Sequence, residues 1–186
     1  MEEKKTSKGL KEDIEIPEGV QVSVENEIVR VKGLKGELER RLKNPRVEIA
    51  VKNSNVVLTS KKNSKKEKKI LGTFLAHISN MIEGVQNEYV YKLKICSGHF
   101  PMSVSVKDNK FIVQNFYGEK IPRVLNLRAG AKVEVKGDLI EVSSIDKEAA
   151  GQTAASIEQL TRRPHYDHRI FQDGIYMIEK AGKEIK

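Results

Sequence analysis

The segment at residues 161–173, TRRPHYDHRIFQD, interleaves cationic side chains with aromatic ones. Arginine can hydrogen-bond a phosphate and stack on a ring at the same time, and tyrosine or histidine can stack on an unpaired nucleobase. The residues that carry this chemistry are Arg162, Arg163, His165, Tyr166, His168 and Arg169. By themselves they leave two interpretations open, a nucleic-acid contact or an ordinary charged connection.

A second set of candidate phosphate contacts lies in and just after the stretch NFYGEKIPR at residues 115–123. Gly118 permits a close approach of the backbone to a partner. The alternative is a hairpin turn whose aromatic residues only complete the core, and for Phe116 that alternative is preferred. The candidate cations are Lys120, Arg123 and Arg128.

Six lysines fall within residues 61–69, in the connection that we expect to enter a helix. Cations at a helix N-terminus oppose the helix dipole, so helix stability does not explain their position. Two interpretations weigh equally, a nonspecific attraction for phosphate or a solvated, partly disordered loop. The candidate phosphate contacts in this lysine tract are Lys65, Lys66, Lys68 and Lys69.

No familiar catalytic arrangement accompanies these cations. Cys96 and His99 are three residues apart, but no third group completes a nucleophile, a base and a residue that orients it. His165 and His168 lack further ligands at the spacing of a zinc site. The sequence also has no P-loop and no dinucleotide-binding fingerprint. We therefore expect no enzymatic activity, no cofactor and no bound metal.

The elements that must position these residues form an internal repeat. The sequence VSVENEIVRVKGLKG at 22–36 matches VSVKDNKFIVQNFYG at 104–118, at a constant offset of 82. In both copies, apolar residues alternate on either side of a polar turn, which is typical of a β-hairpin with one buried face. A second pair of alternating runs follows in each copy, and then an apolar pattern of helical spacing, at 70–82 and at 150–160.

Each half therefore reads as hairpin, hairpin and helix. This predicts an α+β fold made of two tandem copies of a small antiparallel sheet packed against one helix. We expect a mobile N-terminal extension at 1–13, a first repeat at 14–88 and a second repeat at 89–186 that ends in the basic C-terminal segment. Alternating apolar residues at 89–95 predict a strand that begins the second repeat.

The composition limits the class of protein. The chain has 186 residues, and 34 Lys and Arg against 26 Asp and Glu give a formal net charge of +8, as expected of a protein that binds phosphate. A single cysteine rules out an intrachain disulfide and fits a reducing cytosol. Because no apolar run resembles a signal peptide or a membrane span, we expect a cytoplasmic protein that has no membrane partner.

Several segments, in order along nearly the whole chain beyond the first dozen residues, resemble the large-subunit ribosomal protein family L-six (L-nine in older eukaryotic usage). The resemblance is closest to the archaeal branch. One departure is Leu34, which stands where the family usually has proline. The segments are VKGLKGEL (31–38), GTFLAHISNMIEGV (72–85), HFP (99–101), NFYGEKIPR (115–123), EVKGDLIEV (134–142), IDKEAAGQTAASIEQLTRR (145–163) and RIFQDGIYMIEK (169–180).

The resemblance implies two similar α+β domains and a structural role on the large ribosomal subunit, near the sarcin–ricin loop and the stalk base. It also implies partners, namely large-subunit rRNA, neighbouring ribosomal proteins and translational GTPases. With it, an RNA contact becomes the preferred interpretation of residues 161–173. One alternative is that the first domain mainly presents a docking surface to translation factors or stalk proteins. A free-standing RNA chaperone is the third possibility.

Overall fold

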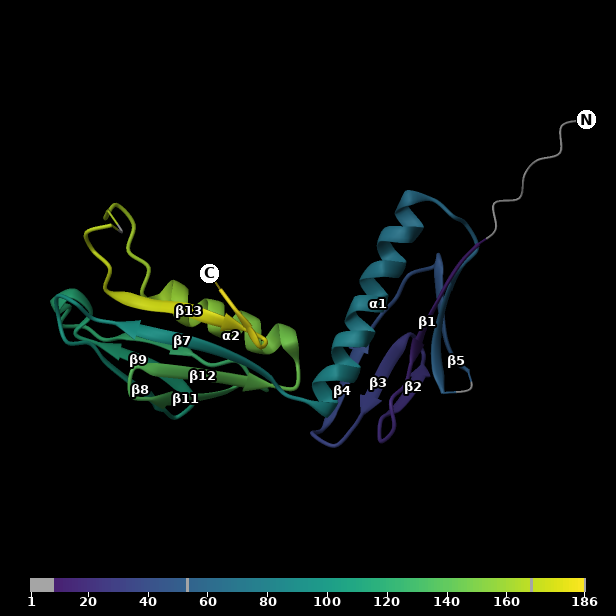
Figure 1. Ribbon diagram of the computed structural model, residues 1–186, viewed down its shortest axis with the longest axis horizontal. Helices are drawn as coiled ribbons and strands as arrows, with labels where there is room; N and C mark the ends of the chain where they lie inside the picture. Colours follow the sequence, from purple (N-terminus) through teal and green to yellow (C-terminus); the bar gives the residue numbers. More distant parts are fainter. Residues whose placement is uncertain (1–8, 53, 168, 186) are drawn as a thin grey trace, which may run out of the picture. The chain divides into compact units, whose positions relative to one another are not determined.

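A computed structural model describes residues 9–52, 54–167 and 169–185. The chain divides into two compact units, Met1–Asn87 and Glu88–Lys186, where the sequence placed the boundary one residue later. In the described residues, each unit contains antiparallel sheets and an α-helix (Figure 1). The predicted α+β class with two tandem copies is therefore confirmed.

The first unit has two small sheets, with strand orders β1-β6-β5 and β2-β3-β4, and neighbouring strands pair antiparallel. Helix α1 (Lys65–Gln86) packs against strands of both sheets. The strands are β1 (Leu10–Glu15), β2 (Gln21–Glu25), β3 (Ile28–Lys32), β4 (Glu37–Arg41), β5 (Val47–Lys52) and β6 (Asn55–Ser60).

The second unit repeats this plan and extends it. One sheet has the order β10-β9-β8, and the other has the order β11-β12-β7-β13-β14. Helix α2 (Lys147–Leu160) lies along one face of the larger sheet (Figure 1). The remaining elements are β7 (Tyr89–Cys96), β8 (Ser103–Lys107), β9 (Lys110–Gln114), the short 3-10 turn η1 (Phe116–Gly118), β10 (Arg123–Asn126), β11 (Lys132–Lys136), β12 (Leu139–Ser144), β13 (Gly174–Lys180) and β14 (Lys183–Glu184).

The predicted hairpins are present at matching positions in the two units. Asn26 and Glu27 join β2 to β3 with φ values of 48° and 67°, and Asp108 and Asn109 join β8 to β9 with φ values of 49° and 59°. Two-residue hairpin loops favour such positive φ values because the resulting turn matches the twist of the strands. The alternating pattern then buries one face of each hairpin, as Val29 and Val31 do in β3.

Helix α1 begins earlier than the apolar pattern suggested. Ser64 caps it by accepting a hydrogen bond from the Lys66 N–H at 3.3 Å, and its hydroxyl also contacts the carboxylate of Glu67, three residues on. This N-cap places the last four lysines of the tract in the first turns of the helix. The prediction that the whole tract lies in the connection is therefore wrong for these lysines. No helix in the described residues is long and apolar enough to cross a membrane.

Two other expectations need correction. Each copy divides its strands between two sheets rather than one. Strands such as β4 (ELERR) escaped prediction because their charge hides the apolar alternation. Residues 10–13, assigned to a mobile extension, belong to β1 and pair with β6, with Leu10 opposite Ser60 and Asp13 opposite Val57. Residues 1–8 lie outside the described part of the chain.

Each unit has its own apolar core. Ile78 of α1 packs there with Val29, Val31 and Leu58 in the first unit, and all of these side chains are fully buried. In the second unit the fully buried side chains include Leu93, Phe111, Ile140, Ile157 and Ile175. Ile175 comes from β13, so this last strand contributes to the core as well as to the sheet.

Candidate nucleic-acid interface

Three segments far apart in the sequence meet at one end of the second unit. They are the loop after β7 (97–101), the turn around η1 (115–119) and the connection from α2 to β13 (161–173), and together they are called the aromatic tip. Asn115 Nδ2 donates to Pro101 O at 2.9 Å, which joins the first two segments. The Tyr117 hydroxyl lies 3.5 Å from Asp173 O, which joins the second to the third.

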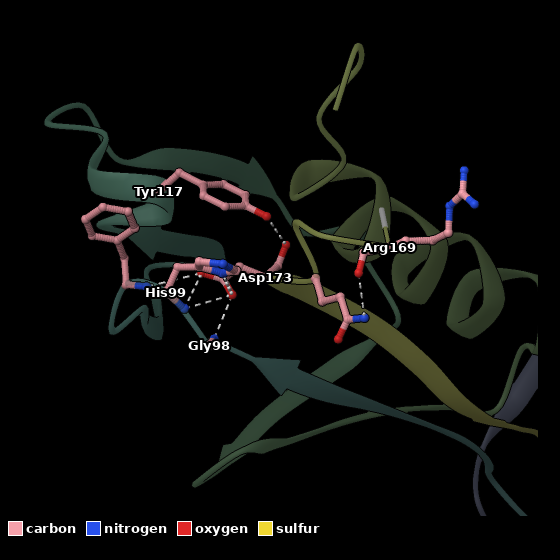
Figure 2. Close-up of polar contacts among 7 residues, drawn as sticks. Gly98, His99, Tyr117, Arg169 and Asp173 are labelled. Carbon is pink, nitrogen blue, oxygen red and sulfur yellow. Dashed lines mark hydrogen bonds and ion pairs between the residues drawn. The ribbon is translucent and has the colours of Figure 1, made fainter. Parts of the chain in front are cut away.

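The carboxylate of Asp173 holds the loop after β7 in place. It accepts hydrogen bonds from the backbone N–H groups of Gly98 at 2.6 Å, His99 at 3.1 Å and Phe100 at 3.2 Å (Figure 2). His99 Nδ1 lies 3.1 Å from Asp173 Oδ1, and the Asp173 side chain is only 3% exposed. A buried carboxylate is costly unless it is fully hydrogen-bonded, and these donors meet that requirement.

The same contacts set the charge of Asp173. Burial by itself would raise the pKa of this carboxyl group, because desolvation penalises its charged form. Hydrogen bonds from the His99 ring and from the backbone amides of residues 98–100 outweigh that effect and lower the pKa below its ordinary value. Asp173 is therefore ionised at neutral pH.

A group of rings and one guanidinium covers the tip. The ring centroids of Tyr166 and Phe171 are 4.9 Å apart, and those of Tyr117 and Tyr166 are 6.2 Å apart. The guanidinium carbon of Arg163 lies 4.2 Å from the Tyr166 ring centroid and 5.3 Å from that of Tyr117. Such cation–π contacts attract the guanidinium to the ring faces and orient it. Tyr166 stays 37% exposed, so its ring is available to a partner.

The backbone of Tyr117 has an unfavourable conformation. Its φ is 49°, in the left-handed region that bulky residues rarely adopt. Burial and the nearby charge of Asp173 raise the pKa of its hydroxyl, so Tyr117 stays neutral. Residues held in such conformations cluster at binding sites, where the surrounding contacts enforce them.

The connection itself is anchored at the end of α2. The helix ends at Leu160, before Pro164, and the buried hydroxyl of Thr161 accepts a hydrogen bond from Ile175 N at 2.9 Å. The same hydroxyl donates to Glu158 O at 3.2 Å. Thr161 thus fixes where the connection leaves the helix and where it returns as β13.

The structure gathers most of the cations predicted in the C-terminal run at this tip. Arg162 is exposed and Arg163 is half-buried beneath its rings. The Arg169 side chain is 92% exposed and lies 3.3 Å from the carboxylate of Asp167. His165 and Tyr166 are exposed in the same connection. His168, the remaining candidate, lies outside the described residues.

Arg123 reaches the tip but is already engaged. Its guanidinium pairs with the two carboxylate oxygens of Glu119 at 2.8 and 2.7 Å and donates to Leu160 O, at the end of α2, at 2.7 Å. It also lies 4.4 Å from the centroid of the buried Phe116 ring. The residue predicted as a phosphate contact thus has a structural role here, whereas its neighbour Lys120 is exposed.

Arg128 is not part of the tip. It begins the turn before β11, where Ala131 N donates to its carbonyl oxygen at 3.5 Å. Gly130 of that turn accepts from Ser144 Oγ at 2.6 Å, and Ser144 Oγ accepts from Asp146 N at the start of α2. The opposite end of α2 is bonded to Arg123, so about 20 Å of helix separates the two arginines.

The lysine tract belongs to the first unit. All four candidate lysines of α1 are exposed, while Glu67 between them is buried and lies 3.3 Å from Arg46 Nη1. The tract thus presents cations outward over an internal ion pair. No His, Cys, Asp and Glu group that could hold a metal ion occurs within the described ranges.

Sequence reasoning missed three residues that build the tip. Asp173 ended the run that was singled out, but its partners lie more than seventy residues earlier, a distance that no local pattern reveals. Tyr117 and Phe171 were visible as aromatic residues in suspect segments. Only the fold shows that their rings meet edge to face, with centroids 6.0 Å apart.

Comparison with known proteins identifies the family. The family model described as ribosomal protein L6 matches residues 16–88 and again residues 100–174, as expected of an internal duplication. The large ribosomal subunit protein uL6 of Methanobrevibacter smithii is 47% identical over 92% of this chain and 96% of its own length. The proteins of the same name from Nanoarchaeum equitans (46% identical, 95% of this chain and 96% of its own length) and Methanosarcina mazei (44%, 94% and 99%) are similar as well. The resemblance to the archaeal branch is confirmed, and the chain belongs to the ribosomal protein L6 family.

Proposed function

We propose that the protein binds large-subunit rRNA near the sarcin–ricin loop and the stalk base, with the aromatic tip as its main contact. As a member of its family it is a structural constituent of the large ribosomal subunit, works in the cytoplasm and is not an enzyme. The place on the rRNA and the neighbouring GTPase-factor region follow from the family resemblance.

One observation carries the assignment of the tip. Arg163 is stacked near Tyr166 and Tyr117, and the exposed Arg162 and Arg169 lie in the same connection. RNA recognition needs cations for phosphate and aromatic faces for unpaired bases, and the tip supplies both on one surface. By contrast, Arg128 and the lysine tract offer charge without accessible rings.

The test is a salt titration of binding with the whole protein. One RNA is a large-subunit rRNA fragment that contains the sarcin–ricin region, and the other is a scrambled RNA of equal length. Each phosphate neutralised should change the slope of log K against log salt by about −0.7 to −0.9. We expect tighter binding to the rRNA fragment, and a loss of that preference when Arg162, Arg163 and Arg169 are replaced by alanine.

Equal binding to both RNAs would reduce the tip to a generic basic surface and favour an RNA chaperone. Lys107→Ala with Lys110→Ala, at the exposed β8–β9 turn, is the matched control and should leave the preference intact.

A second candidate is that the first unit docks a translation factor or a stalk protein. Leu34 favours it, because this side chain is 87% exposed at the turn between β3 and β4. Leu34→Ser should weaken capture of such a protein and leave rRNA binding unchanged. An equal loss of rRNA binding would assign the turn to RNA instead.

A further inference from the structure

A cavity of about 270 Å³ opens beside the aromatic tip, between the end of α2, the connection and the start of β13. Its volume corresponds to roughly nine water molecules. Tyr117, Tyr166, Phe171 and Tyr176 contribute rings to its lining, and Gln159 and Arg162 contribute polar groups. The cavity is thus lined by aromatic faces and opens beside cations.

Two backbone positions at the start of β13 border the cavity. Gly174 is buried at the start of β13, and a Cβ at that position would come within 3.4 Å of the Tyr176 ring. A side chain there would be in van der Waals contact with the ring, so Gly174 and Tyr176 border the cavity together. Thr161 holds the opposite wall by its hydrogen bond to Ile175 N at 2.9 Å. Gly174, Thr161 and Ile175 are buried, so this border of the cavity is part of the folded unit.

The lining suits a flat heteroaromatic ring with a phosphate attached. Stacking on tyrosine is open to every nucleobase, and a purine offers the larger face. The Gln159 amide can donate and accept hydrogen bonds at the edge of a base. Arg162 lines the same opening and can pair with a phosphate, a charge-assisted contact that an apolar peptide side chain does not offer.

We propose that the cavity takes one unpaired purine base of RNA, stacked on Tyr166 and flanked by phosphates on Arg162 and Arg163. The proposal rests on the proposed function and makes it more specific, because it turns a basic surface into a site for a single extruded nucleotide. Specific RNA recognition commonly uses such splayed-out bases.

The test is an NMR titration of the full chain with three probes, AMP, UMP and ribose phosphate. The chain has no Trp and only five Tyr, so labelled tyrosine rings give a sparse spectrum in which Tyr117, Tyr166 and Tyr176 report on the cavity. We expect saturable shifts of these rings with AMP, severalfold weaker binding of UMP and no ring shifts with ribose phosphate.

Tyr166→Ala should weaken AMP binding by roughly five- to a hundredfold, the range expected for loss of one stacking partner. The side chain is 37% exposed, so its removal should leave the fold intact, as unchanged amide resonances of the core will confirm. Phe100→Ala is the matched control, because Phe100 is an exposed aromatic residue of the tip that does not line the cavity.

Equal shifts with ribose phosphate would overturn the proposal and leave only attraction of an anion. UMP binding as tight as AMP binding would refute the purine preference, and absence of any ring shift would refute the site. The rRNA titration separates the two levels. If the rRNA fragment still binds while AMP does not, the cavity fails and the proposed function stands; if the rRNA fragment does not bind either, the proposed function itself fails.

Discussion

The two units differ in what covers the C-terminal end of their helix. In the first unit, α1 continues to Gln86, and the short turn after β3 packs on the end of the helix, with Lys35 N donating to Val85 O at 2.9 Å. In the second unit, α2 stops at Leu160, and the connection and the longer turn around η1 cover that end instead.

The two central sheets differ in the same sense. The order β1-β6-β5 of the first unit corresponds to β7-β12-β11 of the second, but β13 has been added on the far side of β7. Among the described residues, β1 remains an edge strand. The shared elements build most of each core, and β13 adds Ile175 to the core of the second unit. The connection that leads into β13 forms part of the aromatic tip. Binding residues should therefore be sought where a duplicated fold departs from its own symmetry.

The largest effect on the difference between the two units is expected from removing the side chain that β13 adds to the core. Ile175 is 1% exposed, and Ile175→Ala should lower the free energy of unfolding of the second unit by about 2–5 kcal/mol. Hydrogen exchange should show faster exchange in the second unit, while amides of the first unit, which has its own core, keep their protection. A uniform loss of protection in both units would contradict the separation.

Asp173→Ala should have the next largest effect. It leaves the amides of residues 98–100 without their acceptor, at a cost of about 1–3 kcal/mol in the free energy of unfolding. Urea denaturation measures this cost. Asp173→Asn, which keeps one acceptor oxygen, should lose less. If the two variants are equally destabilised, the charge rather than the geometry holds the loop.

The pH dependence of stability should differ between the wild type and Asp173→Asn. Because the folded protein holds the pKa of Asp173 below its ordinary value, the carboxylate stabilises the fold fully above the unfolded pKa of about 4. That stabilisation is lost as pH falls through the lower, folded pKa. Urea midpoints measured from neutral to acid pH should fall more steeply for the wild type, and parallel curves would show that Asp173 contributes nothing.

One glycine in each helix tests how closely α1 and α2 are packed at matching positions. Gly72 of α1 is exposed with open space around it, whereas a Cβ at Gly151 of α2 would come within 3.2 Å of the Tyr91 hydroxyl oxygen. Gly72→Ala should stabilise the first unit by about 0.5–1 kcal/mol through helix propensity. Gly151→Ala should gain less or lose stability, since Tyr91 must move. Thermal melts of the two variants measure these changes in stability. Equal gains in stability would show that the Tyr91 side chain moves aside without cost.

The smallest expected effect concerns the helix starts. Both helices have one glutamate in the first turn, but α2 is capped by the charged Asp146 and begins with the single lysine Lys147. Helix α1 is capped by the neutral Ser64 and begins with Lys65 and Lys66, which oppose the helix dipole. Lys65→Gln with Lys66→Gln should raise the stability of the first unit by about 0.5 kcal/mol. The salt slope of rRNA binding should become shallower only if these lysines contact RNA, which separates a binding role from a solvated helix start.

Sequence patterns predicted the elements that depend on residues close together in the chain. The hairpins around Asn26 and Asp108 were predictable because strict alternation and turn residues act over a few positions. Strands β4 and β13 were missed, the first because charge hides its alternation and the second because nothing in the first repeat corresponds to it. The contacts of Arg123 and Asp173 depend on partners brought close only by the fold, so residue type alone could not show that Arg123 also pairs with Glu119 and the end of α2.

The late position of Asp173, just before β13, also determines the order in which parts of the chain can fold during synthesis. Asp173 follows Phe100 by 73 residues, so the loop after β7 emerges from the translating ribosome long before its acceptor exists. At usual elongation rates of about 5–20 residues per second, that wait lasts roughly 4–15 seconds. The first unit can fold in that interval, but the tip cannot. A nascent chain therefore completes the aromatic tip last, once synthesis is nearly complete.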